Sequence, residues 1–293
     1  MIYLAASIIL NSYLNLAFKL IGKYGINNLQ AIVFNYITCV ITGSIMNGEF
    51  PQGTFKWGNP WIGWAFATGL SFVSLFNLMA FSAQKVGVAV TSVVSKISLV
   101  IPFLFSLYLY NENFTLLKGC GVALAMLSVV LTCLRGKAET TRRDGFAAYW
   151  LIVVPLIIFV WSGLLDTMVK FTEQRFLNEA NYDRYLVTAF GIAAGLGSLS
   201  LIILYLMGMQ RFSRKALLAG ICIGIPNYFS MWCLVKVLKN YAGNSSAIIP
   251  VNNMGIVLLS SVMAWVIFRE KLTRINWIGI LLALVAIAMI AYG

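Results

Sequence analysis

The sequence contains no histidine and only nine acidic residues among 293. The missing imidazole excludes histidine metal ligands, Ser-His-Asp triads and acid–base catalysis by histidine. Asp166 is the only carboxylate inside a long apolar stretch, and one carboxylate does not form a catalytic pair. A membrane-embedded enzyme is therefore the least favoured class of protein, and we expect neither a cofactor nor a metal site.

Cysteine is also scarce. The five cysteines are an odd number, whereas a disulfide framework usually shows an even number at regular spacings. Each lies inside or at the end of an apolar stretch, so we interpret them as small packing residues. They are Cys39, Cys120, Cys133, Cys222 and Cys233. No basic residue precedes the first apolar stretch, which is typical of a retained span and not of a cleaved signal.

Long apolar runs dominate the chain. Hydrophobic residues make up 60% of it, charged residues 10%, and the mean hydropathy is +0.87, which is typical of a membrane protein. A helix needs about 20 mainly apolar residues to span a bilayer. The connections leave no room for a separate soluble domain. The sequence therefore predicts an all-α membrane protein with ten transmembrane helices, near residues 2–20, 29–47, 60–83, 88–110, 115–134, 147–170, 185–208, 216–238, 244–268 and 275–292.

The net charge of +12 would suggest nucleic-acid binding in a soluble protein. In a membrane protein the cations lie in loops beside anionic headgroups, so we expect a lipid bilayer and no nucleic acid as partner. Of the 21 Lys and Arg residues, twelve lie in loops after odd-numbered spans and six in loops after even-numbered spans. The positive-inside rule then makes the odd-numbered loops cytoplasmic and places both chain ends outside.

Part of the chain occurs twice. Residues 111–129 match residues 269–287 at an offset of 158, with five of nineteen positions identical. At an offset of 151, Lys19 matches Lys170 and Lys85 matches Lys236. This pattern predicts a duplicated half-chain, which is a property of many transporter folds. The alternative is a chance likeness between apolar stretches.

Lys96 is the most informative charge. It lies about three residues from the centre of the fourth apolar stretch, roughly 4.5 Å along a helix. A charge at that depth costs between about 3 and about 10 kcal/mol or more. Pro102 follows, and a proline inside a helix releases the carbonyl four residues back, here Ser98. Lys96 therefore either binds a solute or is a structural lysine bonded to that released carbonyl.

Three further charges lie within predicted spans. Asp166 and Lys170 are one helical turn apart, so they either pair with each other or contribute to a binding site. Lys19 closes the first span, where its long side chain either extends to the headgroups or lies at the rim of a cavity.

Polar side chains and prolines mark the middle of several predicted spans. Polar groups are unpaired in lipid, so they face other helices or a cavity. Pro226 and Pro250 should free the carbonyls of Cys222 and Ser246, and broken helices at corresponding places of two repeats point to a transporter binding site. The candidate polar and aromatic residues are Asn15, Asn77, Trp161, Asn227, Tyr228, Asn252 and Asn253.

Each predicted half ends its fourth span with a glutamate, in Tyr110-Asn111-Glu112 and Phe268-Arg269-Glu270. A short turn with threonine follows, and then a glycine, Gly121 or Gly279, opens the next span. This pattern resembles the EamA-like family of the drug/metabolite transporter superfamily over essentially the whole chain. The resemblance implies two inverted five-helix repeats, residues 1–136 and 147–293, joined by a loop at 137–146, around a central cavity. It also implies cytoplasmic chain ends, against the charge count, so the orientation stays open.

The resemblance implies a secondary transporter that moves a small metabolite by alternating access, and we expect it in the cytoplasmic (inner) membrane. Lys96, Asn252 and Asn253 suit a carboxylate or phosphate, while Asp166 suits an ammonium group. The expected substrate is therefore an amino acid or an organic anion. Proton coupling, uniport and exchange stay open, as does the choice between monomer and homodimer. The alternative class is a non-transporting membrane scaffold or assembly subunit, which would lack a hydrated cavity.

Overall fold

Ten α-helices and no strand make up the described part of the chain, which confirms the predicted all-helical class. The computed structural model describes residues 2–48, 58–102, 104–105, 115–133, 145–177, 182–240, 245–270 and 272–292. The helices are α1 (Ile2–Lys23), α2 (Asn28–Asn47), α4 (Ile62–Lys85), α5 (Val88–Ile97), α7 (Leu116–Cys133), α9 (Gly145–Phe176), α10 (Tyr182–Leu206), α11 (Arg214–Asn240), α12 (Ser245–Phe268) and α13 (Arg274–Tyr292).

Seven of these helices carry a stretch that is long and apolar enough to cross a membrane, namely α1, α2, α4, α9, α10, α11 and α12. The other three contain shorter apolar stretches, Val88–Pro102, Leu116–Ser128 and Arg274–Ile290. The chain is thus a multi-pass membrane protein, and the count of ten spans stays a prediction. Residues 106–114, with Glu112, and residues 137–144 of the expected connecting loop lie outside the described part.

Local sequence signals fix several helix ends. The Asn27 side chain accepts a hydrogen bond from the Gln30 N–H at 3.1 Å and so caps the start of α2. Gly48 ends that helix with a φ of 69°, a left-handed conformation that glycine adopts without strain. At the start of α13, Thr273 and Asn276 cap each other's backbone, because each side-chain oxygen accepts from the other residue's N–H.

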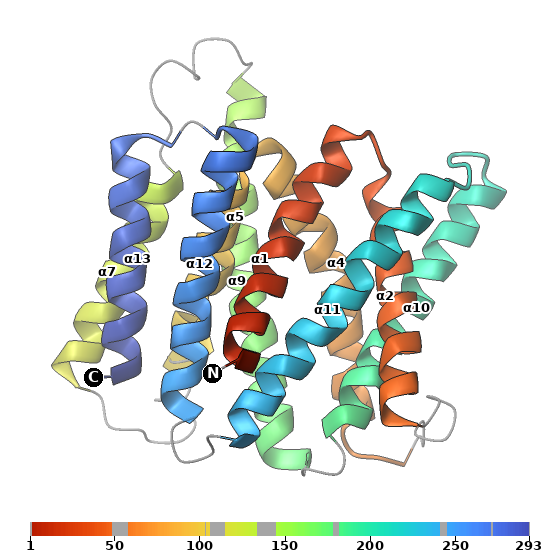
Figure 1. Cartoon of the computed structure of the whole chain (residues 1–293), viewed down its shortest axis with the longest axis horizontal. Coiled ribbons are helices and arrows are strands. Elements are labelled where there is room, and N and C mark those ends of the chain that lie inside the picture. The colour runs from red at the N-terminus through yellow and green to blue at the C-terminus, as the bar shows by residue number, and fades with distance from the viewer. Residues whose placement is uncertain are drawn as a thin grey trace.

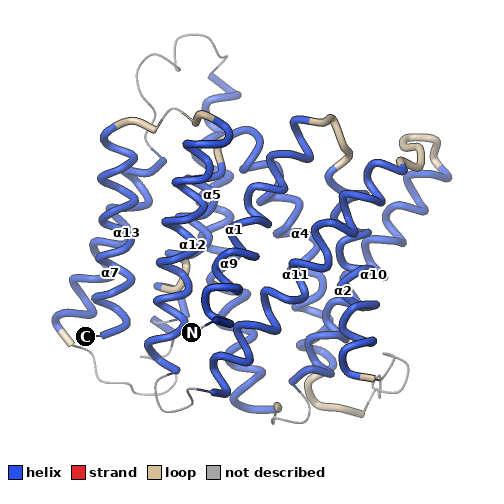
Figure 2. The backbone as a smooth tube through the Cα atoms, in the orientation of Figure 1, coloured by secondary structure: helices blue, strands red, loops and turns tan. Residues whose placement is uncertain are grey.

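Both chain ends lie at one end of the helical bundle, which we call the terminal end (Figure 1). The turns α1–α2, α10–α11 and α12–α13 lie at the opposite end, which we call the turn end (Figures 1 and 2). Described cations gather unequally at the two ends. The turn end has Lys23, Lys85, Arg211, Arg214, Lys215, Arg269 and Arg274, and the terminal end has Lys118, Arg175, Arg184 and Lys236.

Helices from the two halves of the chain pack against each other. α1 packs against α11 and α12, α9 packs against α4 and α5, and α2, α10 and α11 form a further group. Glycines permit the closest of these contacts, since a Cβ at Gly224 of α11 would lie 2.7 Å from the Asn35 carbonyl oxygen of α2. α1 also packs against α4 and α5, whereas α9 makes no comparable approach to α11 or α12 within the described residues.

The buried apolar side chains form two large clusters. One joins α1, α2, α4, α10 and α11 and contains the stacked rings of Tyr36, Phe72 and Phe190. The other joins α5, α7, α9, α12 and α13. Many large apolar side chains on the outside are exposed, as a lipid-facing surface requires. Cys39, Cys120, Cys222 and Cys233 are free thiols, and the Cys133 side chain lies outside the described part.

Candidate functional site

The fourth predicted span is interrupted directly after its lysine. α5 ends at Ile97, a two-residue turn follows, and helical geometry resumes before Pro102. Pro102 has no N–H to donate, and the Ser98 carbonyl accepts instead from the Ile101 N–H at 2.9 Å. The interruption expected from Pro102 is therefore present. The carbonyl, however, is not left free, and the described residues show no hydrogen bond from Lys96 to it.

A glycine lets α9 approach this interruption. A Cβ atom at Gly163 would lie 2.8 Å from the Ser98 carbonyl oxygen and 2.5 Å from Ile101 Cδ1. Both distances are well below ordinary van der Waals contact, so a larger residue would displace its neighbours. The middle of α9 is therefore in direct contact with the interrupted segment.

Lys96 and Asp166 place opposite charges on these two helices. The Lys96 side chain is half-buried and the Asp166 side chain is exposed. Their charges interact, but within the described residues no direct ion pair joins them and neither side chain makes a hydrogen bond. Asp166 does not pair with Lys170 either. The two structural explanations left open by the sequence, a lysine bonded to a carbonyl and an Asp166–Lys170 pair, thus have no support in the described geometry.

Unpartnered hydroxyl groups accompany both charges. Ser92 is buried one helical turn before Lys96, and Ser162 is buried one turn before Asp166. Neither hydroxyl oxygen has a hydrogen-bond partner among the described groups. A buried polar group without a partner costs about 1–3 kcal/mol, so each hydroxyl has hydrogen-bonding capacity that the described residues leave unused. Sequence reasoning missed both serines, although the shared four-residue spacing was a readable signal.

The neighbouring helices α1 and α12 add further polar groups. The Asn15 amide donates to the Ser260 hydroxyl at 3.3 Å. Ser12, three residues earlier on the same face of α1, is buried without a partner, and so is the Oδ1 atom of Asn252. Asn253 is half-buried. α12 packs against both α1 and α5, so α1, α5, α9 and α12 together carry this set of polar and charged groups.

Asn227 and Tyr228 are buried in the contact between α11 and α2. The Asn227 amide donates to Asn35 Oδ1 at 3.1 Å, across the contact between α11 and α2. The Tyr228 ring is buried beside Gly43 of α2, where a Cβ would lie 2.8 Å from the ring. The Asn77 amide donates to the Val73 carbonyl of its own helix at 2.7 Å. Their part in substrate binding stays a prediction.

Pro226 does not interrupt α11, which continues from Arg214 to Asn240. The carbonyl that it should free, that of Cys222, accepts a hydrogen bond from the Tyr13 hydroxyl of α1 at 3.3 Å. The proline thus provides an acceptor for a neighbouring helix without breaking its own. α12 likewise continues through Pro250.

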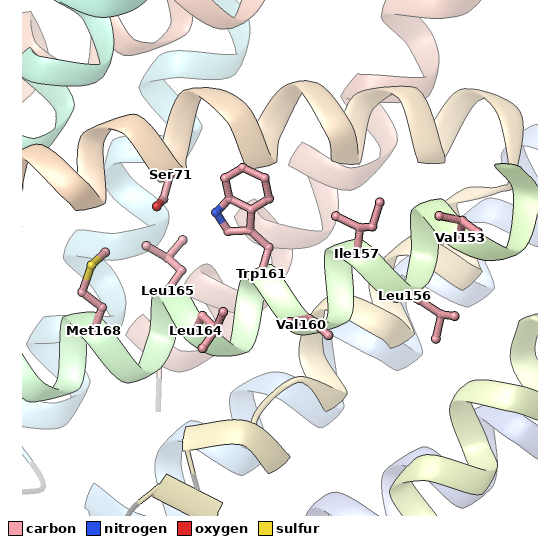
Figure 3. A pocket seen from close by; sticks show the side chains of 9 residues that line it. All are labelled: Ser71, Val153, Leu156, Ile157, Val160, Trp161, Leu164, Leu165 and Met168. Carbon is pink, nitrogen blue, oxygen red and sulfur yellow. The ribbon is translucent and has the colours of Figure 1, made fainter.

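Trp161 lines a lateral groove between α9 and α4. The groove has a volume of about 510 Å³, and eight of its nine lining side chains are apolar. Figure 3 shows the indole pointing from α9 toward α4, which contributes Ser71. Neither Lys96 nor Asp166 is among the residues that line this groove.

Lys19 forms an ion pair with Glu270, at the end of α12. Lys170, its counterpart by sequence offset, is half-buried and has no ion-pair partner among the described side chains. The sequence drew attention to Glu270 only as part of a repeated helix-end pattern.

Comparisons with known proteins agree with these observations. The model of the EamA-like transporter family matches residues 6–134 and again residues 148–292. An uncharacterised protein of Haemophilus influenzae is 27% identical over 282 residues, which cover 94% of this chain and 92% of that protein. A solved crystal structure superposes with a TM-score of 0.58 at 16% identity and covers 99% of this chain and 96% of its own. That structural likeness shows the fold alone.

Proposed function

Because the chain belongs to the EamA-like transporter family, we propose that it is a secondary transporter that moves a small metabolite by alternating access. The family model matches each half separately, which supports two inverted five-helix repeats at 1–136 and 147–293. In this proposed repeat α1 corresponds to α9, α4 to α11 and α5 to α12. The contacts of α1 with α11 and α12 therefore correspond to those of α9 with α4 and α5, and both sets are present. We place the protein in the cytoplasmic membrane as part of this proposal.

The observation that carries the proposal is the unpaired charges of Lys96 and Asp166 beside an interrupted helix. Asp166 is exposed, and a carboxylate exposed to hydrocarbon would be very costly, so water is its natural surrounding. Lys96 is within electrostatic reach yet makes no ion pair. Two opposite charges that do not neutralise each other by direct contact suit a solute that carries both an anionic and a cationic group.

The chemistry of the groups favours a zwitterionic or anionic substrate. The Lys96 ammonium suits a carboxylate or phosphate, and the Asp166 carboxylate suits an ammonium group. The hydroxyls of Ser92 and Ser162 are buried without a partner here, and we propose that they donate to or accept from the same solute in a conformation that exposes them. We therefore propose an α-amino acid or a related organic anion as substrate, bound among α1, α5, α9 and α12.

The test is solute exchange by the purified protein in liposomes, screened with amino acids and organic anions. The variant Lys96→Met should abolish exchange while the protein stays folded, because it keeps the length of the side chain and removes the charge. Lys23→Met, at the exposed end of α1, is the matched control and should keep the parent rate. Parent-level exchange by Lys96→Met would contradict the proposed role of the lysine. If the parent protein exchanged no solute at all, a non-transporting scaffold would be favoured.

Binding can be measured independently of flux. A ligand of the folded state stabilises it by about 2.7 kcal/mol at a concentration one hundred times its Kd. The substrate should therefore raise the melting temperature of the parent protein and of Lys23→Met, but not that of Lys96→Met.

A further inference from the structure

Glu270 joins three helices at the turn end. Its carboxylate accepts hydrogen bonds from the Val88 N–H at 2.8 Å and the Ala89 N–H at 3.4 Å, at the start of α5. The same carboxylate forms the ion pair with the Lys19 ammonium of α1. Both partners suit an anion, because a helix N-terminus has unpaired N–H groups and the positive end of the helix dipole. Glu270 itself follows α12.

The backbone on both sides is shaped for this contact. Arg269, directly before Glu270, has a φ of 51°, a left-handed conformation that is rare for a side chain of this size. Gly87, directly before α5, has a φ of 137°, and a Cβ there would lie 3.2 Å from Glu270 Oε2. The Lys19 ammonium also lies 5.1 Å from the centre of the Phe268 ring. The position of the carboxylate is thus supported from several directions.

The contact belongs to an asymmetry between the two ends of the molecule. α1 packs against α4 and α5, and Gln84 at the end of α4 donates to the Phe18 carbonyl of α1 at 2.9 Å. Exchanging the halves would turn these pairs into α9 with α11 and α12, and the described residues show no comparably close packing of those helices. The contacts of α1 with α4 and α5 therefore keep the turn end closed, and a conformation open at that end would lose them.

We infer that Glu270 is a clasp that holds the turn end closed, and that its carboxylate must leave the start of α5 before this end can open. Lys19 acts as a positioning residue, because its ammonium binds the Glu270 carboxylate and holds it at the start of α5. The inference rests on the proposed alternating-access function. It gives Lys19 a task in the conformational cycle in place of one in substrate binding.

The test uses a cysteine placed on α5, further from the turn end than Glu270, in a purified protein whose native cysteines are replaced by alanine. It measures how fast this cysteine reacts with N-ethylmaleimide. Ser92→Cys is the reporter, since this side chain is fully buried on α5 one turn after Val88. Glu270→Ala should raise its labelling rate about fivefold or more, because losing the contact shifts population toward the open state. Lys19→Gln should raise it less, and Lys23→Gln should leave it unchanged.

A second reporter separates opening from general loosening. Ser128→Cys is equally buried but lies on α7, which takes no part in the contact of Glu270 with Lys19 and the start of α5. A rise at both reporters in the Glu270→Ala protein would overturn the inference, and so would an unchanged rate at Ser92→Cys in the folded protein. If Glu270→Ala does not fold, Glu270→Gln removes the ion pair and keeps an acceptor for Val88. The labelling measurement needs no substrate. If labelling depends on Glu270 but the parent protein exchanges no solute in liposomes, the proposed transport is refuted and the clasp is not.

Discussion

Buried polar side chains of this molecule differ in what their atoms touch. Asn227 and Asn35 bond to each other across two helices, and Asn15 bonds to Ser260. Ser92 and Ser162 touch no described partner. The first kind holds helices together, and the second has hydrogen-bonding capacity that the described residues leave unused. Sequence alone does not separate them, because both kinds lie at mid-depth in apolar stretches and the difference depends on the helix that happens to lie opposite.

Asn227→Ala is expected to lower stability more than function. The variant leaves Asn35 Oδ1 with only the weak Cys39 thiol donor at 3.8 Å, and an interhelical bond of this kind contributes about 0.6–1.7 kcal/mol. Thermal unfolding in detergent should therefore start a few degrees lower, while substrate affinity stays at the parent value. Asn253→Ala is the matched comparison, with weaker binding and unchanged stability. If Asn227→Ala weakened binding and left stability unchanged, the result would support the prediction that Asn227 binds substrate.

The interrupted α5 is the element that positions the charges. Pro102 predicted it, because proline removes a helical hydrogen bond in any surroundings. The same reasoning expected equal interruptions at Pro226 and Pro250, yet α11 and α12 continue through them. For Pro226 the reason is visible, since the Tyr13 hydroxyl satisfies the Cys222 carbonyl. A proline shows where a carbonyl loses its partner, and the neighbouring helix decides what replaces it.

Gly163→Ala should destabilise the contact between α9 and the interrupted segment. The added methyl group would meet the Ser98 carbonyl oxygen and Ile101, and overpacking of this kind costs about 1–3 kcal/mol. Gly195→Ala in the middle of α10 meets nothing within 4 Å, and replacing a helical glycine there should instead add about 0.5–1 kcal/mol. The two variants should thus shift the melting temperature in opposite directions. A stabilised Gly163→Ala protein would show that the two helices are further apart than described.

The whole molecule has a charge asymmetry that follows its topology. Described cations are more numerous at the turn end, as the count over loops predicted. The apolar stretches were also readable from sequence, because hydropathy needs no tertiary information, and self-similarity along the chain predicts the repeat in the same way. The closed turn end was not readable. If the two halves are repeats, as proposed, both carry the same pattern, so which of the two ends is closed is a property of the conformation.

Tags at the two chain ends should report the same side of the membrane. Both ends lie at the terminal end of the bundle, so protease added outside sealed, uniformly oriented vesicles should remove both tags or neither. If the positive-inside rule holds, the tags face away from the cytoplasm. Cleavage of one tag only would contradict the topology, whereas cleavage of both or neither decides between the charge count and the family expectation.

The polar bonds of α1 have a consequence for synthesis. Ser7 bonds to the Ser230 carbonyl, Tyr13 to the Cys222 carbonyl, Asn15 to Ser260, and Lys19 to Glu270. These partners follow α1 by between 209 and 251 residues. At about 5–20 residues per second, the ribosome delivers them roughly 10–50 s after α1 has left it. α1 therefore waits for most of these partners through a long part of translation, beside the insertion machinery or in lipid, with its hydrogen-bonding groups unmatched.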